Sequence, residues 1–351
     1  MVRALSICLM ALLCMAASRA AAEGRLFSDA QPLRIGISAP FKALIAASKS
    51  KTDPYPATLT VTEGAGPAQS LHIQMRARGM SRRTLGYCRI PPLQLAFGDK
   101  ATLKGTPFQG QRKLKLVDYC RDESDYEQRI VLEYLAYRLY NIITPMSFRV
   151  RGADVTYREG DKDAGVTRFG YLIENLDDLA DRNHLPTLTL ASHQITAGQF
   201  DAKAAARATL FEFMIGNLDW DLLAVTPGLE CCHNSRFIAA RTSAPLTGVV
   251  PVVYDFDSSG FVDAPYAGPP PDLPVNSVTE RLYRGYCASN DEIPSVVAEF
   301  RAHRAEMTAL VNGEPRLNQR FRAKAARFLD GFFAVLEDPA RVQNQILKRC
   351  R

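Results

Sequence analysis

The spacing of apolar residues changes along this chain, and this change constrains its fold more than any other feature. Apolar and polar residues alternate in the segment 71–77, and strand-like patterns of the same kind occur at 33–37, 57–62, 90–97 and 113–117. Alternation with a period of two is typical of strands with one buried face. The second half of the chain has mainly helical patterns, including an alanine-rich segment at 201–215. The sequence therefore predicts an α+β fold with strands first and helices later.

One helix is expected inside the strand-rich part. Ser124 and Glu127 have the spacing of a capping box, and an apolar stripe follows them to about Asn141. We therefore expect two lobes, a strand-rich N-lobe with one helix at 23–174 and a mainly helical C-lobe at 175–351. A cleft between two lobes is the default place for a ligand.

The first 22 residues differ from the rest of the chain. Arg3 precedes an apolar run from Ala4 to Ala17, and small residues at 20–22 follow. These are the features of a secretory signal peptide, and the apolar run is short for a membrane span. We expect residues 1–22 to be cleaved and the mature protein to be periplasmic or secreted, without a later transmembrane segment.

Six cysteines lie beyond the predicted signal peptide: Cys88, Cys120, Cys231, Cys232, Cys287 and Cys350. An even number of cysteines in an exported protein suggests disulfides. Cys88 precedes one predicted strand and Cys120 ends another, so these two could bridge if the strands are neighbours. Sequence alone does not choose the other pairs. Zinc is the rival interpretation, but no CxxC or HxxxH spacing supports it.

Charge and motifs exclude several classes of function. The formal net charge is +6, and removal of the signal peptide takes away two arginines and no acid. Such a mild excess does not indicate a nucleic-acid-binding protein. The chain has no GxSxG elbow, no P-loop and no Rossmann glycine pattern.

Acidic residues follow two apolar segments in the stretch 211–260. Asp219 comes just after Gly216-Asn217 at the end of the alanine-rich helix, and Asp255 and Asp257 follow the apolar run 249–253. A phosphotransferase that uses ATP needs one carboxylate to accept a hydroxyl proton, and an Asn and a second carboxylate to hold Mg²⁺. The alternative is that these are ordinary helix-end and turn residues.

Basic residues in the strand-rich part offer phosphate-binding groups. Arg78-Gly79 and Arg82 follow the strand 71–77, and backbone N–H groups near such a glycine could approach phosphate oxygens. Lys115 alternates with leucines on its strand and could pair with nucleotide phosphates. A surface turn and a solvent-facing lysine are the alternatives. Glu133 lies beside the helix stripe, either as an exposed acid or as the ion-pair partner of Lys115.

Taken together and in this order, these segments resemble the CotH family of secreted and spore-coat kinases, which are atypical members of the protein-kinase-like fold. A looser likeness exists to HipA-type kinases. The likeness spans roughly residues 70–260 and depends on five segments: Arg78-Gly79-x-Ser81-Arg82, the Lys115 strand, Tyr171-Leu172-Ile173-Glu174, Gly216-Asn217-Leu218-Asp219-Trp220 and Tyr254-Asp255-Phe256-Asp257. Two features depart from the family pattern, namely Asp221 where a His is common and a long loop with the Cys231-Cys232 pair.

The resemblance implies a role for each matching residue. Asp219 takes the place of the catalytic Asp, and Lys115 that of the phosphate-binding lysine with Glu133 as its partner. Glu174 ends the segment that resembles the hinge beside adenine. Asn234 and Asp255 resemble the residues that hold magnesium, with Asp257 as a second candidate. The implied cofactors are Mg²⁺ and ATP, and Arg78 and Arg82 would help to bind the nucleotide.

Three hypotheses follow from the sequence. The first is an exported phosphotransferase that uses ATP and Mg²⁺ and acts on a protein or small-molecule hydroxyl. The second is a catalytically inactive, pseudokinase-like binding module of the cell envelope, since an exported protein meets little ATP. The third is a metal-dependent hydrolase that uses Asp219, Asp221, His233 and Asp255.

Overall fold

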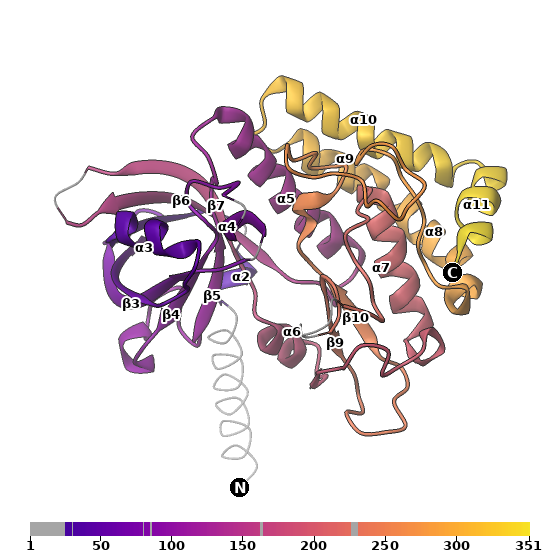
Figure 1. Cartoon of the computed structure of the whole chain (residues 1–351), viewed down its shortest axis with the longest axis horizontal. Coiled ribbons are helices and arrows are strands. Elements are labelled where there is room, and N and C mark those ends of the chain that lie inside the picture. Colours follow the sequence, from indigo (N-terminus) through magenta and orange to yellow (C-terminus); the bar gives the residue numbers. More distant parts are fainter. Residues whose placement is uncertain (1–24, 30, 80, 85, 162–163, 226–230) are drawn as a thin grey trace, which may run out of the picture. The chain divides into compact units, whose positions relative to one another are not determined.

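The computed structural model describes residues 25–29, 31–79, 81–84, 86–161, 164–225 and 231–351. The predicted signal peptide lies outside these residues. The chain divides into two compact units, shown in Figure 1. The barrel unit is Met1–Arg121 with Val150–Glu174, and the helical unit is Asp122–Arg149 with Asn175–Arg351.

Seven strands of the barrel unit close into a barrel in the order β1-β2-β3-β4-β5-β7-β6. The strands are β1 (Leu33–Ala39), β2 (Tyr55–Thr62), β3 (Gln69–Ala77), β4 (Leu93–Phe97), β5 (Lys113–Val117), β6 (Val150–Glu159) and β7 (Val166–Ile173). Neighbouring strands are antiparallel, except that β1 runs parallel to β6 and so closes the barrel. Alternate residues of each strand fill the barrel interior, as the burial of Leu71, Ile73 and Met75 on β3 illustrates.

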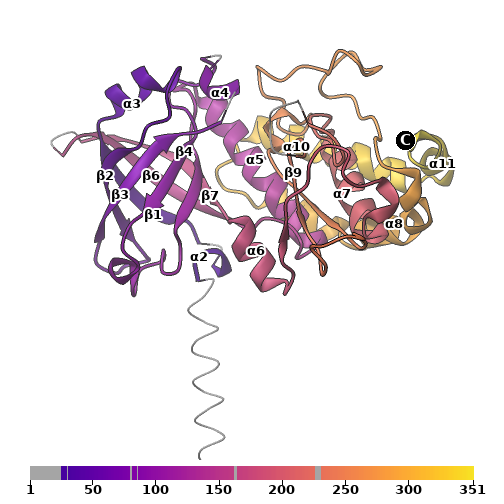
Figure 2. The ribbon, with the colours of Figure 1, turned by 60° about the horizontal axis from the view of Figure 1, so that its bottom comes forward.

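Short helices lie toward the two ends of this barrel (Figure 2). The helices of the unit are α2 (Arg25–Ser28), α3 (Phe41–Ser48), α4 (Ser81–Thr84) and the 3-10 helix η1 (Lys100–Leu103). At the start of β6, Arg151 donates to the carbonyl of Leu26 in α2 at 3.0 Å. At the end of β6, Glu159 accepts the backbone N–H of Lys42 in α3 at 2.9 Å. Phe41 of α3 packs its ring 5.7 Å from Tyr157 and so covers the barrel core.

The prediction of a two-lobed, protein-kinase-like fold is wrong. The strands form a closed mixed barrel, a second three-stranded sheet lies in the helical unit, and the barrel unit has several helices instead of one. The helix at 124–143 belongs to the helical unit. The physical reason is the pairing of β6 with both β1 and β7, which removes the open edges of the sheet.

The helical unit contains the remaining elements. They are α5 (Ser124–Ile143), α6 (Leu176–Arg182), β8 (Thr187–Leu188), η2 (Ala197–Gln199), α7 (Ala202–Ile215), β9 (Ser235–Ile238), β10 (Val250–Val253), η3 (Phe256–Ser258), η4 (Cys287–Glu292), α8 (Ile293–Ala302), α9 (Arg304–Asn312), α10 (Gln319–Leu336), α11 (Pro339–Gln345) and η5 (Leu347–Arg349). The sheet order is β10-β9-β8. The predicted capping box is absent, because α5 has Glu123 at its N-cap without a side-chain hydrogen bond.

Aromatic rings join three elements in the core of the helical unit. Tyr140 of α5 stacks on Phe211 of α7 with ring centroids 4.3 Å apart. Phe256 of η3 lies 4.6 Å from the ring of Tyr137 and 5.3 Å from that of Phe211. Aromatic pairs at these distances contribute about 0.5–1.5 kcal/mol each beyond their buried area. The core therefore fixes η3, with its acidic residues, against both helices.

Three disulfides join the cysteines in the described part of the chain. They pair Cys88 with Cys120, Cys231 with Cys232, and Cys287 with Cys350. The predicted Cys88–Cys120 bridge is thus confirmed. Disulfides persist in oxidising compartments, so these pairs fit the expected export of the protein. None of the helices in the described ranges has the length and apolar character needed to cross a membrane.

Candidate functional site

The loop after α7 begins with a glycine in the left-handed conformation. Gly216 (φ 63°) caps the helix, and a Cβ at this position would lie 3.0 Å from the ring of Phe328. Only glycine adopts this conformation without steric cost. The Oδ1 atom of Asn217 then accepts the backbone N–H of Asp219 at 3.1 Å. The chain turns sharply there, and the side chain of Asp219 is 47% exposed.

The residues after Asp219 anchor the loop to the helical unit. Trp220 is buried, and Asp221 accepts the backbone N–H of Leu223 at 2.8 Å. Burial alone would raise the pKa of Asp221, but the Leu223 hydrogen bond and the charge of Arg351 outweigh it, so this pKa is lowered. Asp221 is therefore an ionised acid that holds the loop.

Two side chains from the segment before β9 form hydrogen bonds with Asp219. The Nε2 atom of His233 lies 2.7 Å from Oδ1 of Asp219. The Nδ2 atom of Asn234 donates to the Asp219 carbonyl at 2.7 Å and to Oδ2 at 3.2 Å. The Asp219 hydrogen bond raises the pKa of His233 against the effect of burial, and the charges of Asp219 and Asp255 add to this rise. The result is an oriented carboxylate–imidazole pair.

The β9–β10 hairpin brings Asn234 and Asp255 to the same place. Ser235 of β9 pairs with Val253 of β10, and the N–H of Tyr254 donates to the carbonyl of Asn234 at 3.0 Å. Asn234 (φ 50°) and Asp255 (φ 67°) both have left-handed backbone conformations. Such strain in non-glycine residues costs about 1–3 kcal/mol and concentrates at functional sites. The hairpin therefore carries two strained polar residues side by side at one end.

Three carboxylates of the helical unit form a compact cluster. Glu133 of α5, Asp255 and Asp257 of η3 each offer one oxygen, and these oxygens lie within 4.8 Å of one another. Glu133 and Asp257 are buried, with exposures of 1% and 7%. Ligands that are all carboxylate oxygens suit hard divalent cations such as Mg²⁺, Mn²⁺ or Ca²⁺. The donor set therefore fits a divalent cation. We call Glu133, Asp255 and Asp257 the acidic metal cluster.

Tyrosines support the acidic metal cluster. The hydroxyl of Tyr137 accepts the backbone N–H of Asp255 at 2.9 Å, which helps to hold the left-handed turn. The hydroxyl of Tyr266 donates to Oδ2 of Asp257 at 2.9 Å and fixes that carboxylate. Hydrogen bonds that orient ligating carboxylates are typical of metal sites.

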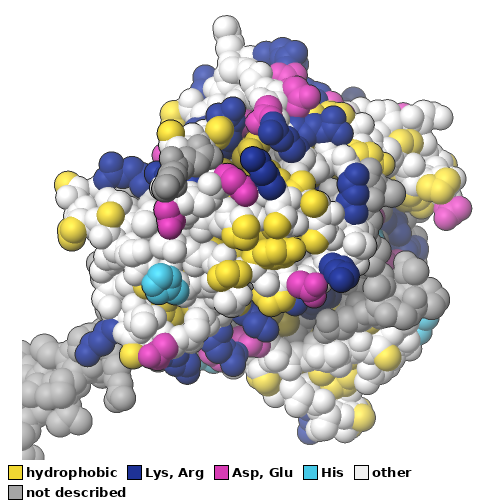
Figure 3. Space-filling view, turned by 60° about the vertical axis from the view of Figure 1, so that its left-hand side comes forward, with side chains coloured by type: hydrophobic (Ala, Val, Ile, Leu, Met, Phe, Trp, Pro, Cys, Tyr) yellow, Lys and Arg dark blue, Asp and Glu magenta, His cyan; other side chains and the backbone are white. Residues whose placement is uncertain are grey.

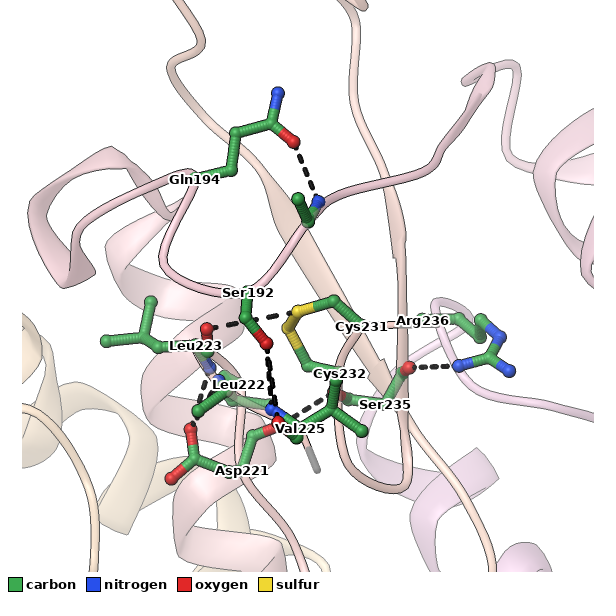
Figure 4. Close-up of a disulfide and its surroundings, with 12 residues drawn as sticks. Ser192, Gln194, Asp221, Leu222, Leu223, Val225, Cys231, Cys232, Ser235 and Arg236 are labelled. Atoms are coloured by element: carbon green, nitrogen blue, oxygen red, sulfur yellow. Dashed lines mark hydrogen bonds between the residues drawn. A yellow bond between two sulfur atoms is a disulfide. The ribbon is translucent and has the colours of Figure 1, made fainter. Parts of the chain in front are cut away.

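A disulfide between adjacent cysteines directly precedes His233 and Asn234, which contact Asp219. Figure 4 shows Cys231 and Cys232 beside the segment that runs from Asp221 to Val225. The backbone N–H of Val225 donates to the hydroxyl of Ser192 at 3.1 Å, and the carbonyl of Asp221 accepts the hydroxyl of Ser235 at 3.0 Å. The Ser235 contact ties the start of β9, which follows His233, to the loop that carries Asp219.

The structure brings Asp219 together with Asn234, and Asp255 together with Asp257 and Glu133, and both groups lie within the helical unit. The other predicted site residues belong to the barrel unit. Lys115 is on β5, Glu174 follows β7 and is buried, and Arg82 is buried in α4 after Arg78. The role of these four residues in binding a nucleotide stays a prediction.

A cavity of about 530 Å³ beside α3 in the barrel unit is a weaker candidate. Its acids are engaged locally, because Glu159 accepts the N–H of Lys42 and Asp161 accepts the hydroxyl of Ser38. His72, to which the sequence gave no catalytic role, also lines it. Figure 3 shows hydrophobic side chains near the middle of one face, with charged side chains around them. Among the described residues, the lining of this cavity holds no group of three carboxylates like the acidic metal cluster.

Sequence reasoning missed two features of the site. The sequence offered Glu133 as an exposed acid or as the partner of Lys115, and it did not predict that a Glu133 oxygen lies beside those of Asp255 and Asp257. The available signal was a Glu inside the apolar run 130–137, since a buried acid normally has a partner or a ligand. His233 was considered only as a metal ligand, and its contact with Asp219 has no local sequence signal.

No protein-family model matches this chain, and no curated protein matches it either.

Proposed function

We propose that this chain is an exported, divalent-metal-dependent enzyme that transfers a phosphoryl group from a nucleotide to a hydroxyl acceptor. The observation that carries the proposal is the acidic metal cluster of Glu133, Asp255 and Asp257. Like charges at this distance repel one another, and a divalent cation relieves the repulsion. The Cys88–Cys120 and Cys287–Cys350 disulfides favour an oxidising compartment.

Asp219 is the group that would act on the acceptor. Its carboxylate is half exposed, and His233 and Asn234 fix its orientation. A fixed, accessible carboxylate can align an acceptor hydroxyl and take its proton. A Mg²⁺ ion in the acidic metal cluster would neutralise charge on the phosphate oxygens. The likeness to CotH-type kinases likewise implies Asp219 as the catalytic acid and Asp255, with Asp257 as second candidate, as magnesium ligands. It differs in adding Asn234 to the magnesium site and in making Glu133 the partner of Lys115.

A metal-dependent hydrolase is the second candidate. The contact between His233 and Asp219 favours it, because an imidazole beside a carboxylate can take a proton from water as well as from an alcohol. The two candidates differ in the acceptor alone, so a single assay separates them.

The test is to incubate the full-length mature chain with Mg²⁺ and γ-labelled ATP, with and without a panel of protein and polyol acceptors. Transfer of label to an acceptor supports the phosphotransferase, and label released only as inorganic phosphate supports the hydrolase. Both activities should disappear in Asp255→Asn and persist in Asp272→Asn, a change at an exposed loop acid. Absence of both activities, with every nucleotide tried, would reject the proposal.

A further inference from the structure

Two arginines hold the loop that carries Asp219. The Nη1 atom of Arg284 donates to the carbonyls of Leu218 at 2.6 Å and of Trp220 at 2.9 Å. The Nη2 atom of Arg351 donates to Oδ2 of Asp221 at 2.8 Å. Leu218, Trp220 and Asp221 surround Asp219 in the sequence. Both neighbours of Asp219 are therefore restrained by a guanidinium group, whereas the half-exposed side chain of Asp219 contacts His233 and Asn234.

The single tryptophan of the chain lies between these contacts. The guanidinium carbon of Arg284 lies 5.2 Å from the ring of Trp220, and that of Arg351 lies 5.6 Å from it. Cation–π contacts at this range are favourable, and more so when they are desolvated. Arg284 and Arg351, here called the arginine pair, thus bind the loop through its carbonyls, one carboxylate and one ring.

A disulfide fixes one member of the arginine pair. Arg351 directly follows Cys350, which is bonded to Cys287. The backbone of Arg351 also pairs with this segment: its N–H donates to Gly285 at 2.9 Å, and its carbonyl accepts from Cys287 at 3.2 Å. The disulfide is thus the covalent link that, together with these hydrogen bonds, keeps the Arg351 guanidinium beside Asp221.

We propose that Arg284 and Arg351 are positioning residues for Asp219, and that the Cys287–Cys350 disulfide is required to keep Arg351 in that role. This inference rests on the proposed function of Asp219. It does not involve the acidic metal cluster, whose residues come from α5 and the segment at 255–257. Loss of the disulfide or of Arg351 should therefore disturb the Asp219 loop and leave metal binding intact.

The experiment compares the oxidised full chain with three variants: Arg351→Ala, Cys287→Ser/Cys350→Ser, and the control Arg304→Ala. Arg304 also lies over an aromatic ring, that of Phe333, and pairs with Asp330 and Glu337, but it makes no contact with the Asp219 loop in the described structure. The readouts are the emission of Trp220, its quenching by acrylamide, Mn²⁺ affinity, and kcat and KM for phosphoryl transfer. Tryptophan emission reports the loop whether or not the protein is active.

The inference predicts red-shifted emission and stronger quenching in Arg351→Ala and in the double cysteine variant, with wild-type emission in Arg304→Ala. It also predicts a fall in kcat of about tenfold, which corresponds to about 1.4 kcal/mol, with unchanged KM and Mn²⁺ affinity. If Arg351→Ala does not fold, Arg351→Lys takes its place, since a lysine ammonium lacks the separate Nε and Nη2 donors that contact the Arg284 carbonyl and Asp221. Unchanged Trp220 emission in the folded variants overturns the inference. An inactive wild type with shifted emission in the variants rejects only the proposed function.

Discussion

The Nε2 atom of His233 lies 2.7 Å from Oδ1 of Asp219, and Asn234 reaches the other oxygen of the same carboxylate at 3.2 Å. Asp219 is thus held at both oxygens by consecutive residues, although it lies in a different loop. Those two residues precede β9, whose partner β10 leads directly to Asp255. A change in the β9–β10 hairpin would therefore move the oriented carboxylate and part of the acidic metal cluster together.

The hydrogen bond between His233 and Asp219 predicts how stability depends on pH. The bond raises the pKa of His233 above its ordinary value of 6.5. The contribution of this hydrogen bond to the unfolding free energy is therefore fully present below pH 6.5, and it is lost as the pH rises through the pKa of His233 in the folded protein. Since both side chains are more than a third exposed, we expect a contribution of only about 0.5 kcal/mol. Urea unfolding between pH 5.5 and 9 measures it.

His233→Gln should remove this pH-dependent part of the unfolding free energy, and Asp219→Asn should remove the same part. The double variant should lose no more than either single variant, because the two residues share one interaction. Additive effects of the two changes would show that the residues do not interact in solution.

Replacement of Tyr137 by Phe tests the hydrogen bond that the Tyr137 hydroxyl accepts from the backbone N–H of Asp255. The change removes the hydroxyl that accepts the Asp255 N–H and keeps the ring that packs on Phe256. A fully buried N–H that loses its acceptor costs about 1–3 kcal/mol, and this one is partly buried, so the unfolding free energy should fall by about 1 kcal/mol. The left-handed turn should also loosen and weaken Mn²⁺ binding by about fivefold, or 1 kcal/mol.

Tyr140→Phe is the matched control on the same helix. Tyr140 stacks on Phe211 and has no described contact with Asp255, so its replacement should leave Mn²⁺ affinity unchanged. Equal losses of Mn²⁺ affinity in the two tyrosine variants would show that the Tyr137 hydroxyl has no special role.

Glu212 predicts a second pH dependence of the unfolding free energy, which arises from the burial of an acid and not from a hydrogen bond. This residue of α7 is fully buried, and the side chain of Asn217 lies beside its carboxyl group. Burial raises its pKa well above the ordinary 4.5, and the charge of Asp219 acts in the same direction. Because the pKa is raised on folding, the unfolding free energy is not reduced by Glu212 below pH 4.5. It decreases as the pH rises from 4.5 toward the pKa of Glu212 in the folded protein.

Glu212→Gln should therefore match the wild type in unfolding free energy at pH 4 and exceed it at pH 8. The difference should grow by about 1.4 kcal/mol for each pH unit between the ordinary and the folded pKa. Denaturant unfolding at several pH values measures this difference. A variant that is equally destabilised at every pH would show that the Glu212 carboxyl makes an interaction that glutamine cannot replace.

Local patterns were sufficient to place most strands but not to close the barrel. Alternating residues such as Leu71, Ile73 and Met75 predicted β3 directly, because one face of a strand must be buried. The parallel pairing of β1 with β6 joins segments that are more than a hundred residues apart, and no local pattern specifies it. β9 was missed because it has four residues and includes Arg236, so the stretch of apolar residues is too short to be recognised as a strand.

The site was predictable where polar residues end apolar elements. Asp219, Asp255 and Asp257 stood out because each follows a buried segment. Glu133 and His233 acquire their roles only through tertiary contacts, with η3 and with the loop after α7 respectively. Which acids form one cluster depends on how α5 packs against η3, which the sequence of either element does not reveal.

The most direct test of the account is a Mn²⁺ titration of the oxidised, full-length mature chain, followed by calorimetry and by electron paramagnetic resonance. The cluster of Glu133, Asp255 and Asp257 predicts a single saturable site. Affinity should fall by more than about tenfold, or about 1.4 kcal/mol, in Asp257→Asn and remain at the wild-type level in Asp272→Asn. Wild-type affinity in folded Asp257→Asn and Glu133→Gln proteins, or no Mn²⁺ binding by the wild type, would contradict the account.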